Sequence, residues 1–446
     1  MSSVAVEEDV SQDLSSDRIE PLADQATGGG TARPGWLRDV ALFLTAQSTS
    51  IIGSSLVTYA LTWYITLKTG SGAQFALLLI ASQLAAALTA IPGGVWADRH
   101  WRKLLMMASD AGVAIVTMIL AAFMLNGFES VWLIAVCLAL RGLGSGIQQP
   151  AVSAALPQIA PSDKLLRINS LNQALQAIIM VASPALALVL LSFLPLGWIL
   201  MVDVVTAAIG IGITAFIRIP KPTAEMRADA QSHAQGYLGH TAEAVRYAWR
   251  IPGLRRALVM CAVMLTFVVP LGQMGPVFVV HLFGSEQWML AACEMAFFIG
   301  MVAGGVTMGA WGGLRNRMTL ATIGMAGFSA MVVLMGLAPN IWVFIAALGL
   351  MGFMLPVLNT PLVTAIQEII PENMMGRVMS LVTLINTVCF PLGMAVAGPM
   401  ADRVNVGGMA VVVGVAGLVF LAVLTLIGGP GSKLYAPQAA PSASAA

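Results

Sequence analysis

The sequence predicts an all-α polytopic membrane protein with 12 transmembrane helices in two pseudo-symmetric halves of six. Two features of composition support a membrane protein. Of the 446 residues, 58% are hydrophobic and only 10% are charged, whereas soluble proteins carry about 25% charged residues. The apolar residues also come in about twelve runs near the ~20 residues that a helix needs to cross a bilayer. The net charge of +1 gives no indication of a nucleic-acid partner.

The predicted spans divide the chain into halves with polar segments around them. Residues 1–35 have too few apolar side chains to form a core, so they are predicted to be a disordered cytoplasmic tail, and 429–446 a second tail. Residues 36–217 would form the N-terminal half and 256–428 the C-terminal half. Between them, 218–255 reads as a cytoplasmic linker in which 241–250 forms either a lipid-binding amphipathic helix or a solvated one. The predicted spans cover 39–66, 72–97, 104–126, 130–157, 168–193, 195–217, 256–282, 286–310, 317–337, 341–365, 376–400 and 406–428.

Basic residues set the predicted orientation. All but three of the 22 Lys and Arg residues fall in segments on one side of this arrangement; Lys68 and Arg403 fall on the other side and Arg141 within a span. Cytoplasmic loops are enriched in Lys and Arg, so both termini are predicted to be inside. Tryptophans near the predicted span ends fit an interfacial belt: Trp63, Trp96, Trp132, Trp198, Trp288, Trp311 and Trp342.

An internal repeat supports the division into halves. The segment 159–171 contains Ile-Ala-Pro-Ser-Asp followed by Arg167 and Ser-Leu, and 369–381 contains Ile-Ile-Pro-Glu-Asn followed at the same spacing by Arg377 and Ser-Leu. The spacing of Gly94, Trp96 and Arg102 likewise recurs in Gly309, Trp311 and Arg317. Two parallel repeats of six helices predict a binding site near the bilayer midplane, between the halves.

The turn 93–103 joins the second and third predicted spans. Its glycines allow close helix approach, and its aspartate can face the positive end of a neighbouring helix. The turn resembles the loop signature of the major facilitator superfamily, G-x-x-x-D-R-x-G-R-R/K, with tryptophan in place of the second glycine. The resemblance implies that Asp98 caps the eleventh helix near Arg377 and locks the halves when the transporter faces outward. The predicted latch residues are Gly94, Asp98, Arg99, Arg102, Lys103 and Arg377.

A closer resemblance covers most of 40–428. Segments 60–64, 68–71, 98–103, 183–185, 218–221, 300–305 and 376–381 resemble the macrolide-efflux branch of drug:proton antiporters, although Ser183 precedes Pro184 where the helix-5 signature reads Gly-Pro. The resemblance implies proton-coupled efflux of amphipathic, cationic drugs by alternating access. The implied partners are a lipophilic small molecule, protons and membrane lipid. It also implies a monomer in the bacterial inner membrane.

Three ionisable residues within spans are the candidate proton-coupling or substrate residues, because charges inside a bilayer are costly and tend to be functional. Glu294 could exchange a proton or pair with a cationic drug, or remain a protonated, hydrogen-bonded interior residue. Asp203 could be a second proton or cation site, or a structural partner for an arginine or a helix backbone. Arg141 resembles the helix-4 arginine of the superfamily and could act in coupling or form a static ion pair.

Other polar residues in the spans are secondary candidates. Asp110 lies close to the turn 93–103 and is expected to support its charge cluster rather than bind substrate. Gln47, Gln273, Asn359 and Asn386 could line the cavity or form hydrogen bonds between helices.

Other classes of function receive little support from the sequence. The four cysteines lie singly in apolar runs, so no disulfide, metal or cofactor site is predicted. No phosphate-binding G-x-x-x-x-G-K-[ST] segment occurs, and an enzyme is not expected. Two alternatives to drug efflux remain: an exporter or symporter of a nutrient, siderophore or lipid, and a non-transporting membrane sensor or scaffold.

Overall fold

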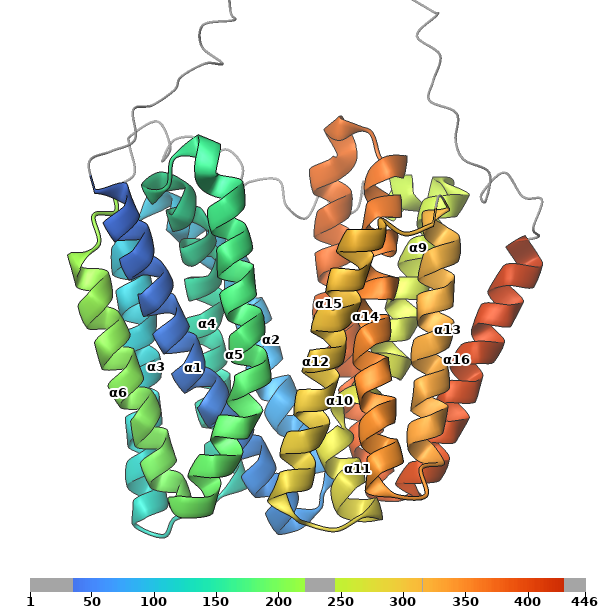
Figure 1. Ribbon diagram of the computed structural model, residues 1–446, viewed down its shortest axis with the longest axis horizontal. Coiled ribbons are helices and arrows are strands. Elements are labelled where there is room, and N and C mark those ends of the chain that lie inside the picture. Colours follow the sequence, from blue (N-terminus) through green and yellow to red (C-terminus); the bar gives the residue numbers. More distant parts are fainter. Residues whose placement is uncertain (1–34, 221–244, 315, 429–446) are drawn as a thin grey trace, which may run out of the picture.

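A computed structural model describes residues 35–220, 245–314 and 316–428, and its regular structure there is helical throughout (Figure 1). Twelve helices of this described part are long and apolar enough to cross a bilayer, in agreement with the predicted fold class. The predicted tails, apart from Gly35, and linker residues 221–244 lie outside the described residues. Residues 245–250 of the candidate amphipathic helix are helical, and Arg246 and Trp249 are exposed there.

The N-terminal half contains six long helices, and local sequence signals mark the boundary between the first two. Ser71 caps α2, because its hydroxyl oxygen accepts a hydrogen bond from the Gln74 N–H at 3.3 Å. Gly70 ends α1 in the left-handed conformation that favours glycine, with φ of 64°. The helices are α1 (Trp36–Thr69), α2 (Gly72–Arg99), α3 (Arg102–Leu125), α4 (Val131–Ile159), α5 (Leu165–Phe193) and α6 (Leu196–Phe216).

The first span of the C-terminal half differs from its prediction. Instead of one helix over 256–282, the chain forms α9 (Pro252–Val263), a π-helical turn (Met264–Val268), α10 (Val269–Gln273) and α11 (Gly275–Leu282). Pro270 and Pro276 cannot donate backbone hydrogen bonds, so the α-helical ladder is interrupted beside them. The remaining helices are α12 (Gln287–Trp311), α13 (Arg317–Gly336), α14 (Ile341–Ile369), α15 (Glu372–Ala401) and α16 (Val406–Gly428).

The sequence repeat has a counterpart in three-dimensional packing. A Cβ atom added to Gly142 of α4 would lie 2.2 Å from the Ser82 carbonyl oxygen of α2. The same contact recurs between α14 and α12, where a Cβ on Gly352 would lie 2.0 Å from the Phe297 carbonyl oxygen. Counted from the first residue of each helix, Gly352 holds the same position in α14 as Gly142 in α4, and Phe297 the same position in α12 as Ser82 in α2. The two halves therefore use glycine at equivalent places to bring helix backbones together.

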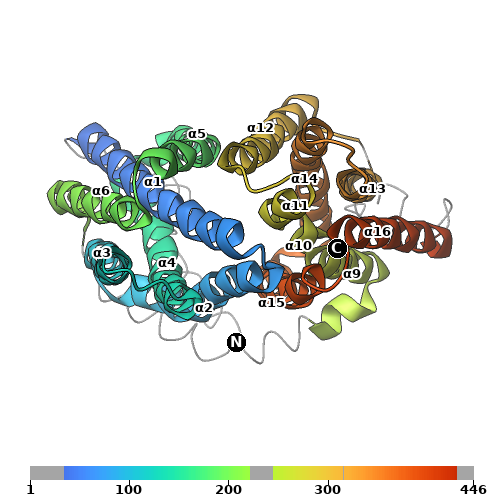
Figure 2. The same cartoon turned by 90° about the horizontal axis from the view of Figure 1, so that it is seen from below.

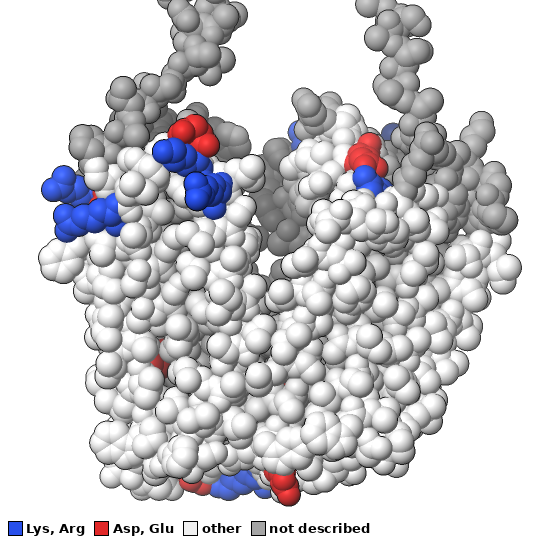
Figure 3. Space-filling view, viewed as in Figure 1, with Lys and Arg blue, Asp and Glu red and all other residues white. Residues whose placement is uncertain are grey.

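The two halves meet at one end of the molecule (Figures 1 and 2). We call the side that holds Trp36 and Gly428 the termini side and the opposite side the far side. On the far side α2 packs against α15 and α5 against α12. Figure 3 shows charged residues gathered at the two ends of the visible face, with a broad, nearly uncharged belt between them, as expected for a chain that crosses a bilayer.

Of the seven tryptophans in the predicted belt, six are exposed and Trp63 is not. The other six are exposed on the helix bundle by between 37% (Trp288) and 71% (Trp132). Trp63 is completely buried and packs in the core between the halves. It lies within α1, which extends to Thr69, so its place near the end of a predicted span did not bring it to the membrane surface.

Candidate functional site: a central cavity between the halves

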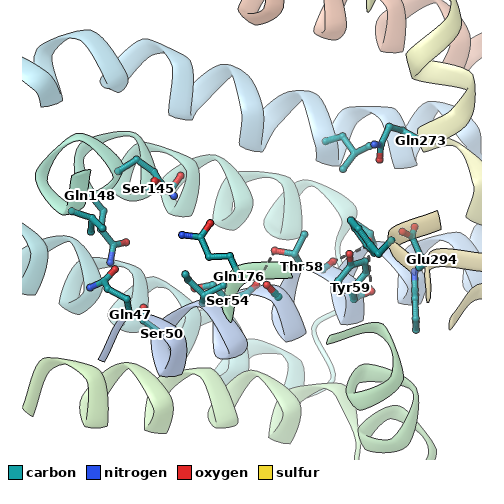
Figure 4. Close-up of a pocket in the computed structure, with 18 of the residues that line it drawn as sticks. Gln47, Ser50, Ser54, Thr58, Tyr59, Ser145, Gln148, Gln176, Gln273 and Glu294 are labelled. Atoms are coloured by element: carbon teal, nitrogen blue, oxygen red, sulfur yellow. Dashed lines mark hydrogen bonds between the residues drawn. The ribbon is translucent and has the colours of Figure 1, made fainter. Parts of the chain in front are cut away.

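A cavity of about 390 Å³ lies between the halves and is the candidate site (Figure 4). Helices α1, α2, α4 and α5 supply one wall, and α10, α11 and α12 supply the other. Among the described lining residues Glu294 is the one charged side chain; the other polar side chains carry hydroxyl or amide groups. The polar lining residues are Gln47, Ser50, Ser54, Ser55, Thr58, Tyr59, Thr62, Ser145, Gln148, Gln149, Asn172, Gln176, Gln273 and Glu294.

Most of this polar lining was missed by the sequence analysis. Ser50, Ser54 and Thr58 follow one another at intervals of four, which places them on one face of α1. Asn172 and Gln176 have the same spacing on α5. This spacing of four residues was the signal in the sequence that could have revealed the polar lining. It was overlooked because hydroxyl residues are common in transmembrane helices, where they often bond to the backbone of the preceding turn, as Thr58 does to the Ser54 carbonyl oxygen at 2.9 Å.

Glu294 projects from α12 into this cavity. Figure 4 places it beside Tyr59 of α1 and near Gln273, at the end of the cavity away from Gln47 and Gln148. Among the described residues its carboxyl group forms neither an ion pair nor a hydrogen bond. An unpaired carboxyl group in a partly dehydrated cavity can take up a proton or attract a cationic ligand.

Arg141 and Asp203 lie together, apart from Glu294. Arg141 of α4 forms a buried ion pair with Asp203 of α6, and it also donates to the Thr117 hydroxyl of α3. Thr117 donates to the same Asp203 carboxylate at 3.2 Å. Both charged residues are buried and do not line the central cavity. The predicted trio is therefore divided into one cavity acid and one buried ion pair inside the N-terminal half.

Asp110 of α3 lies next to the cavity wall. Its carboxylate accepts hydrogen bonds from Ser50 and Gln148, each at 2.8 Å, and both donors line the cavity. The expectation that Asp110 supports the charge cluster of the turn is therefore wrong for this structure. The reason is helical direction: Asp110 faces α1 and α4, and on the same face of α3 it is followed two turns later by Thr117.

Of the four amides that could line the cavity, two do so in this structure. Gln47 and Gln273 line the cavity. Asn359 and Asn386 are exposed and lie outside the cavity lining, and the Asn386 amide donates to the Val382 carbonyl oxygen of its own helix at 2.9 Å.

The predicted latch residues mainly join helices of the N-terminal half. Arg102 donates to the Ala97 and Ala154 carbonyl oxygens at 3.0 and 2.9 Å and forms an ion pair with Asp98 at 3.3 Å. Lys103 donates to the Ala215 and Ile217 carbonyl oxygens at the end of α6. Among the described residues the ion-pair partner of Asp98 is thus Arg102 rather than Arg377, which is half-buried at the start of α15.

Of the two glycines in this turn, Gly93 is the one at a close helix approach. A Cβ on Gly93 would lie 2.8 Å from the Gly146 carbonyl oxygen of α4, whereas a Cβ on Gly94 would meet no atom within 4 Å. Arg99 is half-buried, and its Nε atom has no hydrogen-bond partner among the described residues.

Comparison with known proteins identifies the family. The family model described as Major Facilitator Superfamily matches residues 43–394, and also 287–444. The chain belongs to the major facilitator superfamily. It is a multi-pass membrane transporter, and the twelve membrane-length helices of the described residues form the two halves that are typical of this fold.

Curated relatives in this superfamily are similar over most of their length. Macrolide efflux protein A of Streptococcus pyogenes is 27% identical over 362 residues, which are 81% of this chain and 88% of that protein. The multidrug efflux pump Tap of Mycobacterium tuberculosis is 25% identical over 375 residues, which are 81% and 86% of the two chains. A solved structure of a POT family transporter with 5-aminolevulinic acid has a TM-score of 0.66 at 12% identity and covers 89% of this chain and 96% of its own, so it shows the shared fold.

Proposed function

We propose that this transporter exports amphipathic, cationic drugs in exchange for protons by alternating access. The observation that carries the proposal is Glu294, the one charged side chain among the described cavity residues, facing a wall of hydroxyl and amide groups. A ligand with one basic nitrogen, several hydrogen-bonding oxygens and an apolar body would match this lining. The relatives named as macrolide and multidrug efflux pumps support the same class.

Competition at one carboxyl group would couple the two fluxes. An ionised Glu294 attracts a cationic drug, whereas a protonated Glu294 does not, so drug and proton occupy the site alternately. Proton uptake from one side then releases the drug there, and proton loss to the other side restores the site. The ion pair of Arg141 with Asp203 and the hydrogen bonds of Asp110 form a second polar region behind the cavity, which we propose as an accessory element of coupling.

The distribution of basic residues supports the proposed orientation. Lys164 and Arg167 lie at the start of α5, and Arg255 and Arg256 near the start of α9, all on the termini side. We therefore propose that the termini side is cytoplasmic, in a bacterial inner membrane, and that the structure faces inward. The protein would work as a monomer, since both walls of the cavity come from one chain.

The test is the variant Glu294→Gln, which keeps the shape of the side chain and removes its charge. The initial rate of pH-driven efflux of a fluorescent lipophilic cation from proteoliposomes should fall about tenfold or more, because a charge-assisted contact is lost. Glu129→Gln, which changes an exposed acid outside the cavity, is the matched control and should retain the wild-type rate. Unchanged efflux in Glu294→Gln would remove Glu294 from the mechanism. Proton-coupled transport of a nutrient instead of the cation would favour the symporter alternative.

A further inference from the structure

The far side of the molecule carries a contact between the halves that no predicted site includes. Asp402 directly follows the last residue of α15, and it lies at the start of α2 from the other half. One carboxylate oxygen accepts from the Gly72 N–H at 2.6 Å. The other accepts from the Ala73 N–H at 3.1 Å and from the Ser71 hydroxyl at 2.8 Å. Asp402, from the C-terminal half, thus caps the start of α2.

The start of α2 needs this cap. The first four N–H groups of a helix have no partner within the helix. In α2 the third and fourth donate to Ser71, from Gln74 to its hydroxyl and from Phe75 to its carbonyl oxygen. The first and second have Asp402 as their acceptor. The carboxylate also faces the positive end of the helix dipole. If the halves separated on the far side, two N–H groups and a favourable charge interaction would lose this partner together.

Backbone packing shows that the contact is built into the closed far side. A Cβ on Gly72 would lie 2.7 Å from the Gly398 carbonyl oxygen, and a Cβ on Gly398 would lie 2.8 Å from the Gly72 carbonyl oxygen. These reciprocal glycines allow α2 and α15 to approach until Asp402 reaches the helix start. Beside them, His281 Nε2 lies 2.7 Å from the Gly70 carbonyl oxygen, across the same boundary.

The same six-residue pattern ends both helices. Residues 94–99 and 398–403 each read Gly-x-x-Ala-Asp-Arg, at the end of α2 on the termini side and at the end of α15 on the far side. The two helices run in opposite directions, so each aspartate lies on the side where the partner helix begins. The structure shows the Asp402 contact formed, whereas Asp98 is paired with Arg102 of its own half.

We propose that Asp402 is the latch that keeps the far side closed while the cavity faces the termini side, as the reciprocal partner of Asp98. Each aspartate stabilises one closed side by capping the start of the other helix, and transport requires the two caps to form in turn. Asp402 thereby sets the balance between the two conformations and acts on transport through that balance rather than by touching substrate. This inference rests on the proposed alternating access, and its test uses no substrate, so an error in the drug assignment would not affect the result.

The test measures distances between pairs of spin labels in a variant without the four native cysteines. One pair, Asn126→Cys with Leu337→Cys, reports on the far side, and Leu166→Cys with Gly309→Cys reports on the termini side. All four positions are exposed, and Gly309 has open space around a Cβ. Asp402→Asn removes the charge, and Asp402→Ala removes every acceptor. We expect the ratio of far-side-open to far-side-closed molecules to rise about threefold in the first and about tenfold in the second.

The controls separate a latch from a general structural role. Glu286→Gln changes another acid on the far side, whose side chain bonds to Trp288 in its own half, and should leave both distance distributions unchanged. Asp98→Asn should shift the ratio in the opposite direction. Far-side distances that stay at wild-type values in Asp402→Asn would overturn the proposal. If Asp402→Ala fails to fold, the Asn variant still decides the question, because its amide oxygen keeps one acceptor at the helix start.

Discussion

The two halves share their helix packing but differ in what fills their interiors. In the N-terminal half Thr117, Arg141 and Asp203 form a buried polar cluster across α3, α4 and α6. The corresponding helices of the C-terminal half are α13, α14 and α16. Counted from the first residue of each helix, the equivalent positions there hold the apolar residues Val332, Met351 and Val413. In the same way, Asp110 and Gln148 correspond to Met325 and Leu358, which are completely buried.

This difference shows that the repeat preserves backbone contacts and leaves side-chain chemistry free to diverge. Close helix approach depends on glycine at fixed places, since a Cβ on Gly142 or Gly352 would collide with a carbonyl oxygen. The space between the helices can be filled by a satisfied ion pair or by apolar side chains of similar volume. The N-terminal half therefore holds a polar network, and the C-terminal half contributes one cavity carboxyl group, Glu294.

The largest expected effect comes from breaking the buried ion pair. Asp203→Val introduces the valine that the C-terminal half has at the equivalent position, 413. It leaves the Arg141 charge buried without its partner. Removal of one member of a buried pair should lower the free energy of unfolding by about 3–5 kcal/mol. Chemical denaturation in mixed micelles would measure the loss.

The control for this prediction replaces all three polar residues of the cluster with the apolar residues found at the equivalent positions of the C-terminal half. The triple variant Thr117→Val, Arg141→Met and Asp203→Val reproduces the C-terminal arrangement, in which no buried charge is left unpaired. Its stability should return to that of the wild type or exceed it. A triple variant as unstable as Asp203→Val would show that the two interiors are not interchangeable and that the comparison between the halves fails.

A smaller effect is expected at Asp110, whose equivalent in the C-terminal half is Met325. Asp110→Met, which copies Met325, would leave the Ser50 hydroxyl and the Gln148 amide without their acceptor. Loss of these hydrogen bonds should lower the free energy of unfolding by about 1–3 kcal/mol. The matched change in the other half, Met325→Leu, exchanges apolar residues of similar volume and should cost less than about 1.5 kcal/mol. Equal losses in the two variants would contradict a polar role for Asp110.

The smallest effect is expected outside the membrane, at the ion pair of Lys68 with Glu129 on the far side. The hydrogen bond from Lys68 holds the pKa of the Glu129 carboxyl below its usual range. The stability from this group is therefore present above its unfolded pKa and is lost as the pH falls through the folded pKa. Solvent screens the exposed pair, so Glu129→Gln should lower the unfolding midpoint only slightly at neutral pH. The variant should then lack the equally small loss of stability that the wild type shows in acid below the usual carboxyl range, and a large change at neutral pH would contradict this.

The sequence by itself determined the membrane class, the twelve spans and the twofold repeat. Runs of apolar residues must form helices in a bilayer, because every backbone N–H and C=O group needs a partner there. The internal repeat was readable in the same way, since it rests on comparing local patterns such as those around Arg167 and Arg377. Single ionisable residues in apolar runs also stood out without any structure, which is how Glu294, Asp203 and Arg141 became candidates.

Only the tertiary structure decided which of these residues meet. It paired Arg141 with Asp203 away from the cavity, directed Asp110 toward Ser50 and Gln148, and brought Asp402 to the start of α2. The burial of Trp63 also depended on neighbouring helices. Contacts between distant helices depend on rotation and depth of each helix. Those are set by packing across the whole bundle, and local sequence patterns do not contain them.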